Sequence, residues 1–217
     1  DQPRGASLFI PEEDYGFYSL SALATIIFCE RGLPFLYQGQ EIGMSNRQWK
    51  YDEFNDLETI NQYQIALKAG MSKEQALEIA RHHSRDNART PMQWSSEENA
   101  GFSKGKPWMP VNENYKVVNV AEEEKEYGSI LNFYKRLIAF YKSEEYNEIL
   151  TYGDFRPIYE KEDHIFAYSR SYGCQKLVLI CNFSSKEKDI ELSEDYENVI
   201  FVNYEQTTVI GNTLKMK

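Results

Sequence analysis

The chain has 217 residues, a formal net charge of −10 and a hydrophobic fraction of 41%. This length fits one large domain or up to two ordinary ones, and the hydrophobic fraction argues against a disordered chain. The acidic balance, without any basic run, argues against a nucleic-acid partner, because such binders need clustered Lys and Arg. The sequence has no stretch of 18 apolar residues, so no membrane association through a spanning helix is predicted.

The two ends of the sequence and its cysteines indicate whether the chain is a fragment and in which redox compartment it occurs. It begins at "DQPRG" without an initiator Met or a secretory signal and stops at "GNTLKMK", so we expect a fragment of a longer protein. Cys29, Cys174 and Cys181 are an odd number without metal-ligand spacing, which indicates free thiols in a reducing compartment or core residues. We expect a cytoplasmic protein that uses neither a metal ion nor a cofactor.

In chain order, the first predicted elements are a helix and a buried strand. Residues 15–30, "YGFYSLSALATIIFCE", carry apolar residues at helical spacing, and Gly32 after them favours a helix end. The short apolar run "LPFLYQG", residues 33–39, predicts a buried strand of the parallel-sheet type. A helix followed closely by such a strand indicates an α/β domain.

A predicted loop over residues 41–56 leads to two further helix candidates. Residues 57–70 form the first, and residues 72–87 form the second. The second opens with a capping box, in which the side chains of Ser72 and Gln75 each bond the other's backbone amide.

The segment 84–128 contains three prolines and has little periodicity. A structureless segment of this length inside a compact protein is usually functional. After it, residues 128–145 place their apolar side chains on one face and predict an amphipathic helix.

From about residue 147 the pattern changes to short apolar or alternating runs about ten residues apart, which predicts an antiparallel β domain. The predicted strands lie within residues 164–172, 176–185, 189–192 and 198–204. "YGCQ" at 172–175 has the residues of a hairpin connection. We therefore predict two domains, an α/β domain over residues 1–146 and an antiparallel β-sandwich over residues 147–217.

Several segments occur in one characteristic order: "DQPR", "LPFLYQGQEIGM", "SRDNARTPMQW", "NAGFSKGKPW" and "VNENYKVVNV". Together they resemble the α-amylase superfamily, in the branch of oligo-1,6-glucosidases, dextran glucosidases and trehalose-6-phosphate hydrolases. The resemblance implies a (β/α)₈ TIM barrel followed by a β-sandwich. It makes residues 15–30 the seventh barrel helix, residues 33–39 the eighth strand and residues 128–145 the last helix. The residues between 38 and 128 are then one long loop after the eighth strand, where such barrels build their sites.

The resemblance also implies the chemistry. Retaining glycosidases use a carboxylate nucleophile and a carboxylic acid that protonates the leaving oxygen. In this family the two lie on strands four and five, outside this chain, so the chain alone is expected to be inactive. Asp1 resembles a third family aspartate, which holds hydroxyls of the sugar in the −1 subsite; the alternative is a frayed terminal residue.

Three further residues are implied to bind substrate. Arg85 matches the family arginine that reaches the glucose, and a guanidinium can bond two oxygens at once. Asp56 and Glu58 match acids on the +1 side of the pocket, although acids at this place also suit a helix N-terminus. Arg89 is expected to be structural, and together with Asp86 and Asn87 to satisfy the backbone of the loop.

Other conspicuous side chains are given structural roles. The rings of Trp49, Trp94 and Trp108 could stack on sugars, but packing under the loop is the favoured prediction. The three histidines lack metal-like partners, and two of them end a predicted helix where positive charge is favourable: His82, His83 and His164. Gln40 stands where the family usually has a carboxylate, which leaves the choice of substrate open.

The resemblance leaves alternatives for function and partners. The first prediction is the C-terminal part of an α-glucosidase that cleaves α-1,6 bonds of isomalto-oligosaccharides or dextran ends. The alternatives are a trehalose-6-phosphate hydrolase, a non-catalytic interaction subunit, or one half of a split gene. An incomplete barrel would expose an apolar edge, so the isolated chain is expected to self-associate through it.

Overall fold

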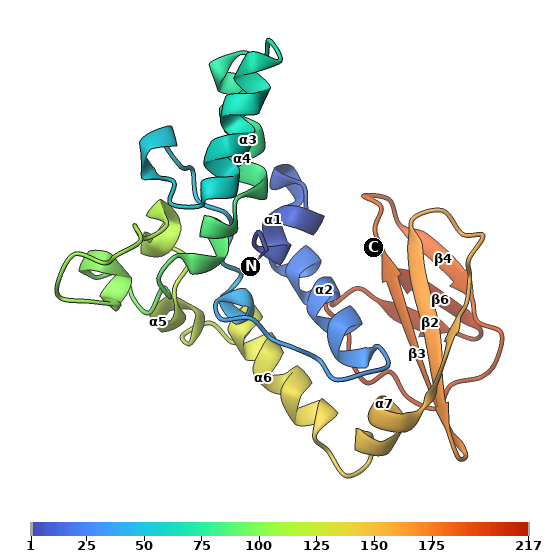
Figure 1. Ribbon diagram of the computed structural model, residues 1–217. Coiled ribbons are helices and arrows are strands. Elements are labelled where there is room, and N and C mark those ends of the chain that lie inside the picture. Colours follow the sequence, from blue (N-terminus) through green and yellow to red (C-terminus); the bar gives the residue numbers. More distant parts are fainter. Residues whose placement is uncertain (1, 217) are drawn as a thin grey trace. The chain divides into compact units, whose positions relative to one another are not determined.

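The computed structural model describes residues 2–216 of the chain. They form two compact units, each assembled from two parts of the sequence. The first takes in the chain up to Leu20 together with Phe35–Lys135, and the second takes in Ser21–Pro34 together with the chain from Arg136 onward. Figure 1 traces the elements in chain order.

The first unit is helical. Its elements are α1 (Gly5–Phe9), the start of α2 (Phe17–Cys29), α3 (Leu57–Lys68), α4 (Lys73–His83), α5 (Val120–Glu123) and the first half of α6 (Ile130–Tyr141). Short 3₁₀ turns separate them at Glu12–Asp14, Gln40–Ile42, Tyr51–Glu53, Arg85–Arg89, Glu98–Gly101 and Glu113–Lys116. The predicted helices over 15–30, 57–70, 72–87 and 128–145 are thus confirmed, although α4 ends at His83.

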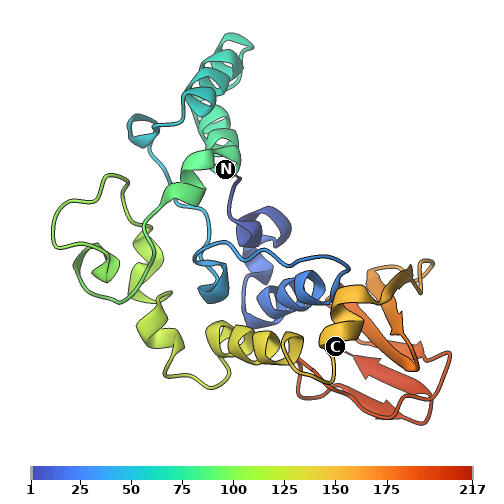
Figure 2. The ribbon, with the colours of Figure 1, turned by 60° about the horizontal axis from the view of Figure 1, so that its bottom comes forward.

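Helices α3 and α4 form an antiparallel helical hairpin (Figures 1 and 2). Asp56 is the N-cap of α3, and Gly70 adopts a positive φ of 91° after its C-terminus. The predicted capping box opens α4: the amide of Gln75 donates to Ser72 Oγ at 3.2 Å, and the amide of Ser72 donates to Gln75 Oε1 at 3.1 Å. Local capping therefore fixes where both helices begin.

Two small apolar clusters support the long loop that surrounds this hairpin. Ile42 and Met44 pack with Met92 and Leu131 in one of them. The other consists of Trp49, Phe54, Ala80 and Met109, and the rings of Trp49 and Phe54 stack at 5.6 Å. Buried side chains thus anchor the segment 41–111, which contains the hairpin, near both of its ends.

The prediction of a buried strand over residues 33–39 is wrong. Residues 33–37 form no strand, and the side chain of Phe35 is 82% exposed. A strand needs a neighbour to bond its backbone, and no strand lies alongside this segment in the described part of the chain. Its backbone groups bond locally instead: the amide of Gln40 donates to the carbonyl of Tyr37 at 3.0 Å.

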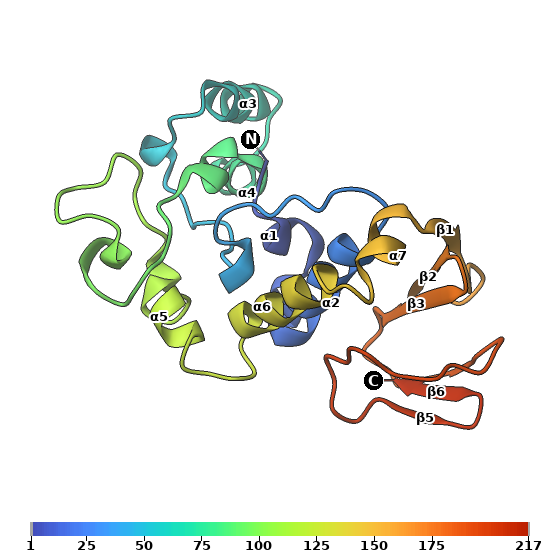
Figure 3. The same ribbon diagram turned by 90° about the horizontal axis from the view of Figure 1, so that it is seen from below.

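The second unit holds the end of α2, the end of α6, α7 (Asn147–Tyr152) and two antiparallel sheets of three strands each (Figure 3). The first sheet has the order β1-β2-β3, with β1 (Asp154–Pro157), β2 (Ile165–Tyr172) and β3 (Gln175–Asn182). Gly173, with a φ of 58°, begins the two-residue turn between β2 and β3, so the hairpin predicted at "YGCQ" is confirmed. The second sheet has the order β4-β6-β5, with β4 (Lys188–Glu191), β5 (Thr208–Ile210) and β6 (Thr213–Met216).

The fourth predicted strand, over residues 198–204, is wrong. No strand forms there, and two of these side chains contact helices of the same unit instead. The ring of Phe201 contacts that of Phe140 at 5.2 Å, and Asn203 Nδ2 donates to Ser21 Oγ at 3.0 Å. Strands β5 and β6 were not predicted, because each is short and the side chains of β5 are all exposed.

Side chains of β2 bond the C-terminal ends of two helices in the second unit. The hydroxyl of Tyr168 donates to Ile26 O at 3.0 Å. The buried guanidinium of Arg170 donates to Cys29 O, Leu150 O and Gly153 O at 2.8–3.2 Å. A cation at a helix C-terminus satisfies carbonyls that have no partner within the helix.

The three cysteines are free, as predicted. Burial raises the pKa of the Cys29 and Cys181 thiols to about 12. These two half-buried thiols are therefore uncharged at neutral pH.

Candidate functional site

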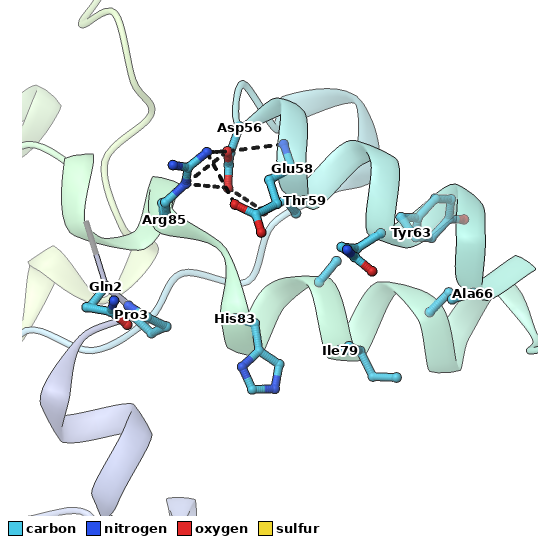
Figure 4. Close-up of a pocket in the computed structure, with 13 residues that line it drawn as sticks. Gln2, Pro3, Asp56, Glu58, Thr59, Tyr63, Ala66, Ile79, His83 and Arg85 are labelled. Atoms are coloured by element: carbon cyan, nitrogen blue, oxygen red, sulfur yellow. Dashed lines mark hydrogen bonds and ion pairs between the residues drawn. The ribbon is translucent and has the colours of Figure 1, made fainter.

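An ion pair between Arg85 and Asp56 forms the centre of the candidate site (Figure 4). Arg85 Nη2 donates to Asp56 Oδ1 at 2.5 Å, and Arg85 Nε lies 3.2 Å from both carboxylate oxygens. The carboxylate of Glu58 lies 3.7 Å from the same Nη2. The structure thus brings together the three predicted substrate residues that it describes, whereas Asp1 lies outside the described residues.

The position of Asp56 is determined by its role as the N-cap of α3. Its carboxylate accepts from the amide of Glu58 at 3.3 Å and from the hydroxyl of Thr59 at 2.7 Å. The hydrogen bond from Arg85 holds the pKa of Asp56 well below its usual range, and the bond from Thr59 adds to this effect against the opposing cost of burial. Asp56 is therefore an anion at neutral pH, and its bond in turn raises the pKa of Arg85.

The three side chains of this cluster differ in their exposure to solvent. The carboxylate of Asp56 is buried, whereas the side chain of Arg85 is 39% exposed and that of Glu58 is more exposed still. Within the described residues, Arg85 Nη1 makes no hydrogen bond. The site thus presents one guanidinium edge and one carboxylate to solvent, which suits the hydroxyl groups of a ligand.

Asp86 holds the backbone that carries Asp56. Its Oδ2 accepts from the amides of Asn55 at 2.7 Å and Asp56 at 2.9 Å. Ser84 Oγ accepts from the amide of Asp86 at 3.2 Å. Because the Thr59 hydroxyl donates its proton to Asp56, Ser84 donates to Thr59 Oγ1 at 3.0 Å. The segment that supplies Arg85 therefore also fixes the N-terminus of α3, and hence the geometry of the ion pair.

Asn87 joins three parts of the loop through its side chain. Its Nδ2 donates to Arg81 O at 2.8 Å and to Ser84 O at 3.0 Å. Its Oδ1 accepts from the amide of Arg47 at 3.0 Å and from Trp49 Nε1 at 2.7 Å. The expectation that Asp86 and Asn87 satisfy the backbone of the loop is confirmed.

Two arginines complete this framework. Arg4 Nε donates to Asn87 O at 3.0 Å, and Arg4 Nη2 donates to Thr90 Oγ1 at 3.0 Å. Arg89 Nη1 donates to Asp86 Oδ1 at 3.3 Å, which agrees with its expected structural role. The sequence motif did not single out Arg4, although its side chain is buried and joins the N-terminal segment to the motif.

A groove of about 420 Å³ runs from the ion pair along α3 and α4 (Figure 4). Besides Asp56, Glu58 and Arg85, it is lined by Gln2, Pro3, Thr59, Gln62, Tyr63, Ala66, Ala76, Ile79, Ala80 and His83. Apart from Glu58, the residues of the helical hairpin were missed as site residues, because their spacing indicated only helix packing.

The tryptophans and histidines fit the predictions in part. Trp49 is buried, as expected, but Trp94 and Trp108 are exposed, so the prediction that they pack under the loop is wrong. The amide of Trp94 donates to Ala100 O at 2.9 Å, and Trp94 is 51% exposed. His82 and His83 lie in the last turn of α4, as predicted.

Within residues 2–216, no three or more His, Cys, Asp or Glu side chains gather in a way that could hold a metal ion. None of the helices described there has the length and apolar character needed to cross a membrane.

Comparison with known proteins identifies related sequences over both parts of the chain. Residues 1–153 match the alpha-amylase catalytic domain, and residues 165–217 match the alpha-amylase SusG C-terminal domain. An oligo-1,6-glucosidase of Bacillus cereus is 43% identical over 90% of this chain and 35% of its own length. A trehalose-6-phosphate hydrolase of Escherichia coli is 33% identical over 96% of this chain and 38% of its own length.

Solved structures of related proteins also superpose on this chain. The trehalose-6-phosphate hydrolase of Bacillus licheniformis superposes with a TM-score of 0.91 at 37% identity, over all of this chain and 40% of that one. The isomaltulose synthase of Protaminobacter rubrum superposes with a TM-score of 0.89 at 34% identity, again over 40% of its length. The chain spans a little over a third of the length of these curated relatives. With its catalytic-domain match over residues 1–153, the chain belongs to the alpha-amylase family.

Proposed function

We propose that the protein to which this chain belongs is a retaining α-glucosidase that hydrolyses α-1,6 bonds of isomalto-oligosaccharides or dextran ends. The observation that carries the proposal is the Arg85–Asp56–Glu58 cluster, which lines the groove beside α3. Relatives named oligo-1,6-glucosidase and glucan 1,6-alpha-glucosidase support the choice of linkage.

The three residues have different roles in this proposal. Arg85 donates from its exposed edge to a hydroxyl of the bound sugar, and Glu58 accepts from a neighbouring hydroxyl. Asp56 has its oxygens occupied by Thr59, Arg85 and the amide of Glu58, so it orients Arg85 rather than the sugar. A guanidinium held by a buried carboxylate loses little freedom when it binds, which favours catalysis through positioning.

The proposal also assigns the parts of the family fold. Helix α2 is the seventh barrel helix, and α6 is the last barrel helix. The two antiparallel sheets form the β-sandwich, with a domain boundary near residue 146. The nucleophile and the acid belong to strands four and five of the barrel, outside this chain, and Asp1 is the third carboxylate of the pocket.

One kinetic experiment tests the roles in the longer protein. Arg85→Ala should lower kcat/KM for isomaltose roughly 10- to 100-fold, because a hydrogen bond to a charged group contributes about 1.5–3 kcal/mol. Lys68→Ala, an exposed change at the end of α3, serves as the control and should leave the rate unchanged. A rate within twofold of wild type for the Arg85 variant would refute the assignment.

Substrate comparison separates the alternatives. A higher kcat/KM for trehalose 6-phosphate than for isomaltose would favour the phosphorylated substrate, which is supported by the relatives of that name. No turnover of either sugar would favour a non-catalytic subunit. The 217-residue chain alone should release no p-nitrophenol from an aryl α-glucoside, and release would contradict the placement of the catalytic pair.

The isolated chain is proposed to self-associate through the exposed residues Phe35 and Leu36, which have apolar side chains and no strand partner in the described residues. Sedimentation of the chain should show dimers that Phe35→Ser weakens. Leu57→Ser changes an equally exposed leucine on α3 and is the matched control. A monomeric wild-type chain at micromolar concentration would rule this out.

A further inference from the structure

Thr59 bonds a side chain at the start of α3 rather than the backbone. It is the third residue after the N-cap Asp56, where a capping box has Glu or Gln reaching back to the amide of the cap residue. In this chain that amide donates to Asp86 Oδ2 at 2.9 Å. The backbone therefore does not need the side chain of Thr59, whose hydroxyl bonds the Asp56 carboxylate at 2.7 Å.

Three donors in a row lead to this carboxylate. An ionised carboxylate only accepts hydrogen bonds, so the single proton of the Thr59 hydroxyl goes to Asp56 Oδ2. Ser84 must then donate the 3.0 Å bond to Thr59, and Ser84 Oγ accepts in turn from the amide of Asp86. Thr59, Ser84 and Asp86 are all buried. Away from water, hydrogen bonds that point the same way along a chain strengthen one another.

The hydroxyl of Thr59 fixes the rotation of the Asp56 carboxylate. The torsion that turns a carboxylate about its Cβ–Cγ bond is soft, so partners must hold it. Oδ1 accepts from Arg85 Nη2 and, at 3.3 Å, from the amide of Glu58. The shortest bond to Oδ2 comes from Thr59, since Arg85 Nε lies 3.2 Å from that oxygen. Thr59 thus sets the plane in which the carboxylate meets the guanidinium.

The orientation of the Arg85 guanidinium depends on that plane. Its Nη2 donates to Oδ1 of Asp56, while its Nε lies 3.2 Å from both oxygens, so the two groups do not form two parallel bonds. The carboxylate of Glu58 is exposed and lies 3.7 Å away, which makes it a weaker anchor. Without the Thr59 bond, the carboxylate can rotate until Nε faces one oxygen and Nη2 the other, and the guanidinium turns with it.

We propose that Thr59 is a positioning residue for sugar recognition, because its hydroxyl holds the exposed edge of Arg85 in the orientation that binds the substrate. The inference rests on the proposed function, in which Arg85 is a ligand of the sugar. Thr59 borders the groove, but its hydroxyl is directed to Asp56 (Figure 4). Its effect therefore reaches the sugar through the ion pair.

Two substitutions of Thr59 in the longer protein isolate the hydroxyl. Thr59→Val keeps the branched side chain but removes the donor, and should lower kcat/KM for isomaltose about tenfold through misplacement of Arg85. Thr59→Ser keeps the donor and should stay within about twofold of wild type. Thr25→Val removes a hydroxyl on α2 that donates to Ser21 O at 2.8 Å, and as the control it should leave the rate unchanged. Equal rates for the Val and Ser variants of Thr59 would overturn the inference.

A double-mutant cycle shows whether Thr59 acts through Arg85. In the Arg85→Ala background there is no guanidinium to orient, so Thr59→Val should change kcat/KM by less than about twofold. A further loss of about tenfold in that background would mean that Thr59 acts independently of Arg85, and would overturn the inference.

Thermal unfolding separates positioning from stability. Thr59→Val leaves a buried carboxylate oxygen with one donor fewer, so its Tm should fall, and the rates are compared at a temperature where circular dichroism shows every variant folded. Thr59→Ala removes the same donor without the second methyl group and should repeat the loss of kcat/KM. A normal rate for the folded Val and Ala variants would make the role of Thr59 structural only. That result leaves the effect of Arg85→Ala in place, so it is distinguishable from failure of the proposed function.

Discussion

Asn87 offers the sharpest test of how the motif "SRDNARTPMQW" is held together. In Asn87→Ala, the amide of Arg47 and Trp49 Nε1 lose their acceptor, and the carbonyls of Arg81 and Ser84 lose their donor. Asn87 is fully buried, so water does not replace these bonds in the folded chain without rearrangement.

The loss of stability in Asn87→Ala can be calculated from the hydrogen-bond donors that the variant leaves without an acceptor. Each buried donor left unsatisfied costs about 1–3 kcal/mol, and the variant leaves two of them. We expect a loss of about 3 kcal/mol in the free energy of unfolding, a large share of the 5–15 kcal/mol typical of a domain. Asn61→Ala, an exposed change on α3, should stay within about 0.5 kcal/mol of wild type.

Urea unfolding followed by tryptophan fluorescence measures the loss. Trp49 is the buried tryptophan of the described residues, so its emission reports on this site directly. Asn87→Asp adds a pH readout. At neutral pH its charge faces the carbonyls of Arg81 and Ser84, and the penalty should shrink as the pH falls and the carboxyl regains a proton to donate. A loss below about 1 kcal/mol for Asn87→Ala would refute the reasoning.

Three further predictions concern other hydrogen bonds. Arg85 lowers the pKa of Asp56 in the folded chain, so the ion pair stabilises the fold above about pH 4, and this stabilisation is lost as the pH falls through the folded pKa. The stability of Arg85→Met should therefore fall less in acid than that of the wild type. An identical dependence of stability on pH in the two proteins would contradict this prediction. Ser72→Ala should cost about 1 kcal/mol, because the amide of Gln75 loses its acceptor, and amide exchange in the first turn of α4 should rise. Arg170→Met should cost about 3 kcal/mol in thermal or urea unfolding, because three carbonyls, two of them in buried bonds, lose their donor. A change below about 1 kcal/mol would show that water replaces the guanidinium.

The parts of the fold that depend on local signals could be predicted from the sequence. The capping box at Ser72, the N-cap at Asp56 and the hairpin at Gly173 each need only a few neighbouring residues, and all three are present. Local geometry decides such features, so a short window of sequence contains the necessary information.

The parts that depend on distant partners could not be predicted. Residues 33–39 and 198–204 have similar apolar compositions, and both were expected to be strands. A strand exists only where another strand bonds it, and residues 198–204 instead pack through Phe201 on Phe140. For the same reason the motif indicated Arg85 but not the groove beside it, which residues of α3 and α4 line.

The bonds of Arg4 bear on how the chain reaches this structure. Its guanidinium donates to the carbonyl of Asn87, which lies 83 positions further along the chain. Closing a loop of that length has an entropic cost before any contact offsets it, and native contacts of large sequence separation slow folding. The helical hairpin α3–α4 is local and can form early, whereas the arginine framework around the ion pair must assemble late. The geometry of the Arg85–Asp56 ion pair is therefore among the last to appear as the chain folds.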